Sequence, residues 1–203
     1  MILYDDPISG NGFKLRLLFA LSGQAYTYKP VYILKRETKA DWFLAKNPAG
    51  QIPVVELNDG TIFRESNAML VHFARDTKFW PQDPIAQTRV LEWLFWEQYV
   101  HEPNVAVIRS WYVKDMLDQF SNQQISDKTE AAKAALKLLD EALAGRDWLV
   151  GETMTIADIS LYAYSHLVGD AGISLNETPN VKAWVERVAV TTGYVGIDDW
   201  ETA

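Results

Sequence analysis

The order of strand and helix signals in the first 77 residues constrains the fold more than any other feature. Residues 2–4 are apolar and predict a short strand, and residues 13–21 are rich in helix formers that stop before Gly23. Residues 26–33 contain β-branched and aromatic side chains and predict a second strand. Two strands joined through a helix pair in parallel through a right-handed crossover. The chain therefore predicts a β-α-β unit at its start.

An antiparallel hairpin and a helix are expected next. Residues 41–46 indicate a short helix, and Asn58-Asp59-Gly60 lies between two apolar runs, which is a strong hairpin signal. Ser66 can cap a helix whose apolar side chains share one face. The predicted order is β-α-β-α-β-β-α.

Every element expected after this unit is a helix. Pro81 and Pro84 indicate a linker over 78–85, so we expect an α/β domain over 1–77 and an all-helical domain over 86–203. Within the second domain, Thr155 and Asp158 are spaced as a capping box, and Pro179 opens the last helix.

Composition and charge exclude several classes of function. The net charge is −8 and the basic residues are scattered, which disfavours nucleic acid as a partner. No apolar run is long enough to span a membrane, and the start lacks a basic export signal, so we expect a cytoplasmic protein. The three histidines share no metal-binding spacing, so no metal is expected. Because the chain has no cysteine, thiol chemistry has to come from a ligand.

Four local motifs resemble one family over the whole chain and in the right order. They are Ser9-Gly10-Asn11, residues 47–54 (NPAGQIPV), residues 64–68 (RESNA), and residues 149–152 (LVGE) ahead of the capping box. Together they resemble a cytosolic glutathione S-transferase, of the serine type found in theta, zeta and many bacterial members, including beta-like enzymes. The resemblance implies a thioredoxin-like domain followed by a helical bundle, glutathione as co-substrate, and a homodimer.

The resemblance assigns the chemistry to the first motif. In serine-type enzymes the serine at this turn donates a hydrogen bond to the glutathione sulfur, which implies that Ser9 is catalytic and that Asn11 is a second donor. Lowering a thiol pKa by about two units requires roughly 2.7 kcal/mol. A hydroxyl donor and a helix N-terminus together supply that order of magnitude. Alternatively, Ser9 is only an N-cap or turn serine and Asn11 only a turn former. Tyr4 is interpreted as a packing residue.

The second and third motifs are expected to hold the peptide. The resemblance implies a cis bond before Pro53, a free Ile52 backbone that pairs with an extended ligand, and Gln51 beside it. Glu65 suits the ligand amino group, and Ser66 with the following helix start suits its γ-glutamyl carboxylate. The alternatives are a strand-edge proline and a simple helix cap.

One position departs from the pattern of many relatives. They carry a histidine before the second helix, near the glycine carboxylate of glutathione, and this chain has Thr38. Threonine can donate a hydrogen bond but brings no charge, so glutathione affinity is expected to be reduced unless Lys35, Arg36 or Lys39 supplies the charge.

The resemblance places the electrophile pocket between the domains, against the first long helix of the second. Candidate lining residues there are Tyr99, His101, Arg109 and Tyr112. Aromatic side chains suit a flat apolar substrate. The alternative is that these side chains form the core of the helical bundle.

Three functions remain open from the sequence. The first is conjugation of glutathione to a small hydrophobic electrophile. The second is glutathione-dependent isomerisation or disulfide reduction, although zeta-type isomerases carry a cysteine where this chain has Asn11. The third is a non-catalytic binding or regulatory protein that kept the fold.

Overall fold

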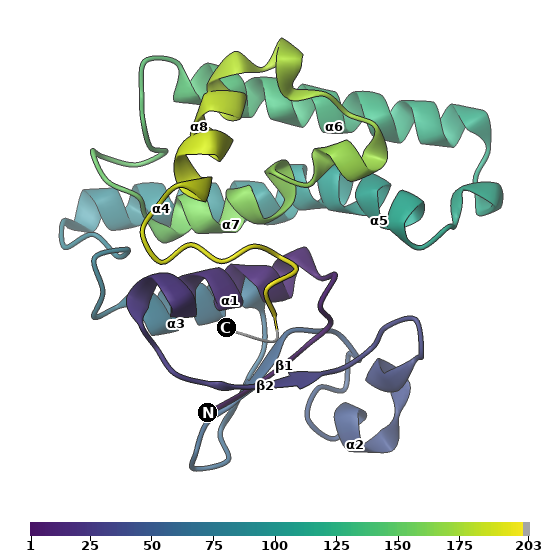
Figure 1. Cartoon of the computed structure of the whole chain (residues 1–203), viewed down its shortest axis with the longest axis vertical. Helices are drawn as coiled ribbons and strands as arrows, with labels where there is room; N and C mark the ends of the chain where they lie inside the picture. The colour runs from purple at the N-terminus through teal and green to yellow at the C-terminus, as the bar shows by residue number, and fades with distance from the viewer. Residues whose placement is uncertain (201–203) are drawn as a thin grey trace. The chain divides into compact units, whose positions relative to one another are not determined.

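The computed structural model describes residues 1–200 and divides the chain into two compact units. Residues 1–77 and 191–200 form the first unit, and residues 78–190 form the second. The first unit contains a small mixed sheet with helices, and the second is helical (Figure 1). This confirms the predicted fold class. Within residues 1–200, no helix combines the length and apolarity that crossing a bilayer requires.

The sheet has four strands in the order β2-β1-β3-β4. They are β1 (Ile2–Asp5), β2 (Thr27–Pro30), β3 (Val54–Glu56) and β4 (Ile62–Phe63). Strands β1 and β2 are parallel, whereas β3 is antiparallel to both β1 and β4. The parallel pair and the hairpin are therefore as predicted. Strand β2 is shorter than the expected 26–33, because proline at its last position has no N–H for the ladder.

The first unit has helices α1 (Gly10–Ser22), α2 (Asp41–Leu44) and α3 (Ser66–Ala74), and a 3₁₀ turn, η1 (Glu37–Lys39). Helices α1 and α3 lie side by side along one face of the sheet (Figure 1). All residues of α1 from 12 to 19 are buried, including Lys14 and Arg16. Helix α1 ends at Gly23, which has φ 69° and closes the helix as expected.

The second unit is built from five α-helices and a π-helical segment among the described residues. These are α4 (Pro84–Trp96), the π-helical η2 (Glu97–Ala106), α5 (Val107–Val113), α6 (Asn122–Leu143), α7 (Ile156–Ser165) and α8 (Pro179–Ala189). Short 3₁₀ turns occur at η3 (Leu117–Gln119), η4 (Val168–Ala171) and η5 (Leu175–Glu177). All ten residues of α7 are buried, so α7 is the centre of this unit, as expected.

The buried carboxylate of Asp158 connects the segments around α7 through hydrogen bonds. Asp158 Oδ2 accepts the Thr155 N–H at 2.8 Å, which confirms the predicted capping box. Asp158 Oδ1 accepts the Leu149 N–H and the Trp184 Nε1–H, both at 3.0 Å. Burial raises the pKa of Asp158 to about 6, and these donors act in the opposite direction. The carboxylate thereby joins the loop before α7 to α8.

The end of the described chain belongs to the first unit. Arg16 donates from Nη1 to the Ile197 carbonyl at 2.6 Å, and the ring of Trp200 lies 5.5 Å from that of Tyr28. The sequence predicted one helical domain over 86–203. Residues 191–200 belong instead to the first unit, and residues 201–203 lie outside the described part. Helix α4 begins at Pro84, inside the predicted linker.

Candidate active site

Ser9 is the N-cap of α1. Its Oγ accepts the Gly12 N–H at 3.1 Å, and its backbone is extended, as an N-cap requires (φ −77°, ψ 121°). A hydroxyl can accept one hydrogen bond and donate another, and the Ser9 hydroxyl also hydrogen-bonds to the Asp5 carboxylate. The expected helix start near Phe13 is wrong by three residues, because the cap begins the helix at Gly10. Asn11 therefore lies in the first turn of the helix and not in the loop before it.

The buried carboxyl group of Asp5 and the guanidinium of Arg16 lie next to each other beside this turn. Asp5 is fully buried at the end of β1, and its Oδ2 lies 3.3 Å from Arg16 Nε. A Cβ added to Gly12 would come within 1.7 Å of the Asp5 carboxylate, so only glycine fits there. Burial raises the pKa of Asp5 to about 7, and the Arg16 guanidinium and the Ser9 hydroxyl act in the opposite direction. Arg16 also donates to the Pro7 carbonyl at 2.9 Å, which holds the turn in place.

The segment that was expected to pair with a peptide lies beside Pro53. The bond between Ile52 and Pro53 is cis, as predicted. Asn47 shapes the loop before it, donating to the Gln51 carbonyl at 2.7 Å and accepting the Ala49 N–H at 3.2 Å. Within residues 1–200, the Ile52 N–H and C=O have no hydrogen-bond partner. An extended peptide can therefore pair with this backbone.

The start of α3 is strained and tied to α1. Glu65 has φ 65° and ψ 104°, a conformation that costs a non-glycine residue about 1–3 kcal/mol. Ser66 was expected to cap the helix but is its first residue, because Glu65 takes the cap position. The Ser66 hydroxyl donates to Asn11 Oδ1 at 3.1 Å. The first turns of α1 and α3 therefore meet through side chains.

Sequence reasoning missed a buried cation at the same place. Lys14, fully buried on α1, donates to Ser66 Oγ at 3.4 Å and to Asn67 Oδ1 at 3.2 Å. The sequence did contain a signal for it, because Lys14 and Arg16 lie within an otherwise apolar predicted helix. Charged side chains in such a helix are rarely buried without a specific role.

Thr38 is buried in η1, next to the loop that carries Gln51. Its carbonyl would lie 2.8 Å from a Cβ on Gly50, so the two segments are packed closely. Lys39 donates to the carbonyls of Ala49 at 3.2 Å and Gly50 at 3.3 Å. Of the three cations considered as substitutes for a loop histidine, Lys39 thus lies against the loop before Gln51.

The four candidates for the electrophile pocket are divided between core and surface. His101 is fully buried and hydrogen-bonded to Ser165 Oγ at 2.9 Å, and Arg109 is paired with Asp170 Oδ2 at 2.8 Å. Tyr99 is 90% exposed and Tyr112 is 38% exposed. A hollow on the same helical run is lined by other residues: Gln98, Glu102, Pro103, Ala106, Val107, Ser110 and Tyr164.

Tyr4 is a packing residue, as interpreted from the sequence. It is 3% exposed, and its hydroxyl donates to Glu56 Oε2 at 2.7 Å. Burial and this hydrogen bond raise the pKa of Tyr4. Because its hydroxyl proton is donated to Glu56, Tyr4 does not offer that proton to a ligand thiolate.

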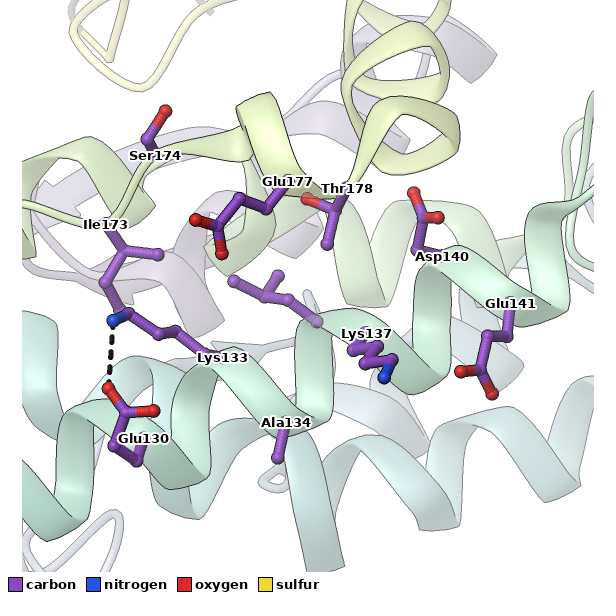
Figure 2. Close-up of a pocket in the computed structure, with 11 residues that line it drawn as sticks. Glu130, Lys133, Ala134, Lys137, Asp140, Glu141, Ile173, Ser174, Glu177 and Thr178 are labelled. Atoms are coloured by element: carbon purple, nitrogen blue, oxygen red, sulfur yellow. Dashed lines mark hydrogen bonds and ion pairs between the residues drawn. The ribbon is translucent and has the colours of Figure 1, made fainter.

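A second hollow lies between α6 and the segment 173–178 that precedes α8 (Figure 2). Lys133 on its wall pairs with Glu130 at 2.9 Å, as the dashed line in Figure 2 marks. Asp140 accepts the N–H groups of Asn180 at 2.7 Å and Val181 at 2.9 Å and so caps α8. These polar groups hold helices together. Within residues 1–200, no three His, Asp or Glu side chains are grouped to hold a metal ion.

The order of the elements and the joined starts of α1 and α3 define a class of protein: a thioredoxin-like α/β unit followed by a helical unit. Residues 3–78 match the family model "Glutathione S-transferase, N-terminal domain", and residues 94–190 match "Glutathione S-transferase, C-terminal domain". The chain belongs to the glutathione S-transferase family, as the motifs predicted.

The chain is similar to proteins with different names. A crystal structure of a glutathione S-transferase from Pseudomonas fluorescens is 39% identical, with a TM-score of 0.93, over 97% of this chain and 98% of that one. Glutathione S-transferase theta-1 of Mus musculus is 30% identical over 94% of this chain and 83% of the relative. Elongation factor 1-gamma of Artemia salina is 28% identical over 83% of this chain, but only 40% of that protein is covered.

Proposed function

We propose that this protein is a glutathione transferase that activates the glutathione thiol for attack on a small hydrophobic electrophile. In this reaction the thiolate sulfur forms a bond to an electrophilic carbon, and the leaving group departs with its electron pair. Ser9 donates a hydrogen bond to the thiolate from the start of α1.

The observation that carries the proposal is the 3.1 Å hydrogen bond from Ser66 to Asn11. Each helix N-terminus favours a negative charge. The bond brings two such termini together in one unit. Glutathione has two negative groups at this end, its thiolate and its γ-glutamyl carboxylate, and the paired helix starts suit both.

The remaining groups of the tripeptide find matching partners in the same unit. The cysteinyl backbone pairs with the free N–H and C=O of Ile52, beside Gln51 and Pro53. The ligand amino group lies at Glu65, which is exposed and held in a strained conformation. Lys39, next to Thr38, supplies the charge for the glycine carboxylate that a loop histidine supplies in many relatives.

The test is a comparison of Ser9→Ala with Ser22→Ala. Ser22 lies at the other end of the same helix, where its hydroxyl donates to the Leu18 carbonyl at 2.6 Å. Ser9→Ala removes the hydroxyl donor and leaves the helix start, so it should raise the pKa of the bound thiol by about one unit and lower turnover of a chloronitroaromatic at neutral pH by about threefold or more. Ser22→Ala should change neither quantity.

Two results separate the possible failures. If thiol pKa and turnover are the same in Ser9→Ala and wild type, the role of Ser9 is wrong. If the wild-type protein binds no glutathione in calorimetry, the whole proposal is wrong.

The similarity to elongation factor 1-gamma supports a second candidate, a non-catalytic binding module. It predicts that glutathione is bound weakly or not at all and that no electrophile is turned over. Calorimetry with glutathione, followed by a panel containing an electrophile and a mixed disulfide, distinguishes this candidate from conjugation and from glutathione-dependent disulfide reduction.

We also propose a homodimer. Three large apolar side chains on α4 and η2 are highly exposed: Ile85 at 72%, Phe95 at 71% and Tyr99 at 90%. Such a set on one helical run suits burial against a second copy. Light scattering of the wild type and Phe95→Glu tests this, because the charge should produce monomers.

A further inference from the structure

The fully buried Lys14 is the feature of the proposed glutathione site that the mechanism above leaves without a role. Its ammonium group comes from the second turn of α1 and reaches the first turn of α3, where it donates to Ser66 Oγ and Asn67 Oδ1. Removing a lysine from water costs several kcal/mol, and an apolar side chain of similar length is often neutral or better at such a position. Packing alone therefore does not explain a cation here.

The direction of the hydrogen bonds defines what Lys14 does to its neighbours. Lys14 has donors only, so Ser66 Oγ accepts from it. The Ser66 proton is then directed away from Lys14, to Asn11 Oδ1 at 3.1 Å. With its oxygen engaged by Ser66, Asn11 presents its amide NH₂ to other partners. Hydrogen bonds therefore run from Lys14 on α1 to Ser66 on α3, and from Ser66 back to Asn11 on α1.

The charge of Lys14 also adds to the helix start that it contacts. The first N–H groups of α3 carry a partial positive charge, about half an elementary charge. A full positive charge fixed 3.2–3.4 Å from the side chains of its first two residues strengthens that potential in a buried, weakly screened place. The start of α3 therefore attracts a carboxylate more strongly than a helix terminus alone.

We propose that Lys14 is a positioning and specificity residue, which orients Ser66 and Asn11 and gives the start of α3 its preference for the γ-glutamyl carboxylate over a neutral group. This inference rests on the proposed function, since it concerns the same ligand. Lys14 acts behind Ser66, and it needs no direct contact with the ligand.

The test measures how much more tightly glutathione is bound than a ligand without the γ-glutamyl carboxylate, and not only the affinity for glutathione. Calorimetry compares glutathione with an analogue whose γ-glutamyl α-carboxylate is converted to the carboxamide. We expect the wild type to bind glutathione at least about tenfold more tightly than the analogue, because hydrogen bonds to charged groups are the stronger ones. Lys14→Met should lose most of this preference, while Lys14→Arg, which keeps the charge, should retain it.

Lys46→Met is the matched control. It removes a cation from the same unit, where Lys46 pairs with Glu56 at 2.6 Å, and it should leave the preference unchanged. If Lys14→Met does not fold, Lys14→Gln replaces it, since the amide keeps a donor without the charge and should also lose the preference.

The outcomes separate the two proposals. If the wild type binds neither ligand, the proposed function fails and this inference with it. If the wild type prefers glutathione and the Lys14 variants weaken both ligands equally, Lys14 has only a structural role and this inference alone is overturned.

Discussion

Replacing Asp158 by alanine should destabilise the helical unit more than any surface change. The carboxylate is fully buried and accepts from Leu149 N–H, Thr155 N–H and Trp184 Nε1–H. Each donor left buried without an acceptor costs about 1–3 kcal/mol. Because water can partly enter the vacated space, the loss is smaller than the sum over the three donors. We expect Asp158→Ala to lower the free energy of unfolding by about 4 kcal/mol, and the total free energy of unfolding of a protein is about 5–15 kcal/mol.

Urea unfolding at pH 7.5, followed by tryptophan fluorescence and circular dichroism, measures this loss. At that pH the carboxylate is charged in the wild type, since its pKa is about 6. Asp147→Ala is the control, because that side chain is 71% exposed and pairs with Arg187 at the surface. The control should lose less than about 1 kcal/mol. If Asp158→Ala loses no more than the control, the hydrogen bonds do not carry the stability assigned to them.

Three further predictions concern buried groups in each unit. Gly12→Ala should cost at least about 3 kcal/mol or prevent folding, because its Cβ meets the buried Asp5 carboxylate; Gly169→Ala, with open space around it, should be tolerated. Relative to Asp5→Asn, wild-type stability should fall by on the order of 4 kcal/mol as pH rises from about 4 to 7, because the folded carboxyl keeps its proton up to about pH 7 and the unfolded one loses it near 3.8. A pH-independent difference in urea midpoints would contradict this. Arg109→Met should cost about 1–2 kcal/mol in the same assay through loss of the Asp170 pair, and an unchanged midpoint would show that the pair contributes nothing.

Local sequence signals predicted the parts of the site that depend on neighbours along the chain. The hairpin at Asp59-Gly60, the cis bond before Pro53 and the capping box at Thr155 and Asp158 are all present. Each is set by interactions over a few residues, so a short motif contains the information. The start of α1 was misplaced because Gly10 and Gly12 look like turn residues, although Gly12 serves the close approach of Asp5 inside a helix.

The sequence by itself therefore determined the order of the elements, the turn chemistry and the family. The tertiary structure decided the partners of the buried charges. Lys14 meets Ser66 across 52 residues, and Arg16 meets the Ile197 carbonyl across 181. No local pattern indicates which way a cation on an otherwise apolar helix will point. That direction depends on which segments pack against each face of α1, and those contacts join residues that are far apart in the sequence.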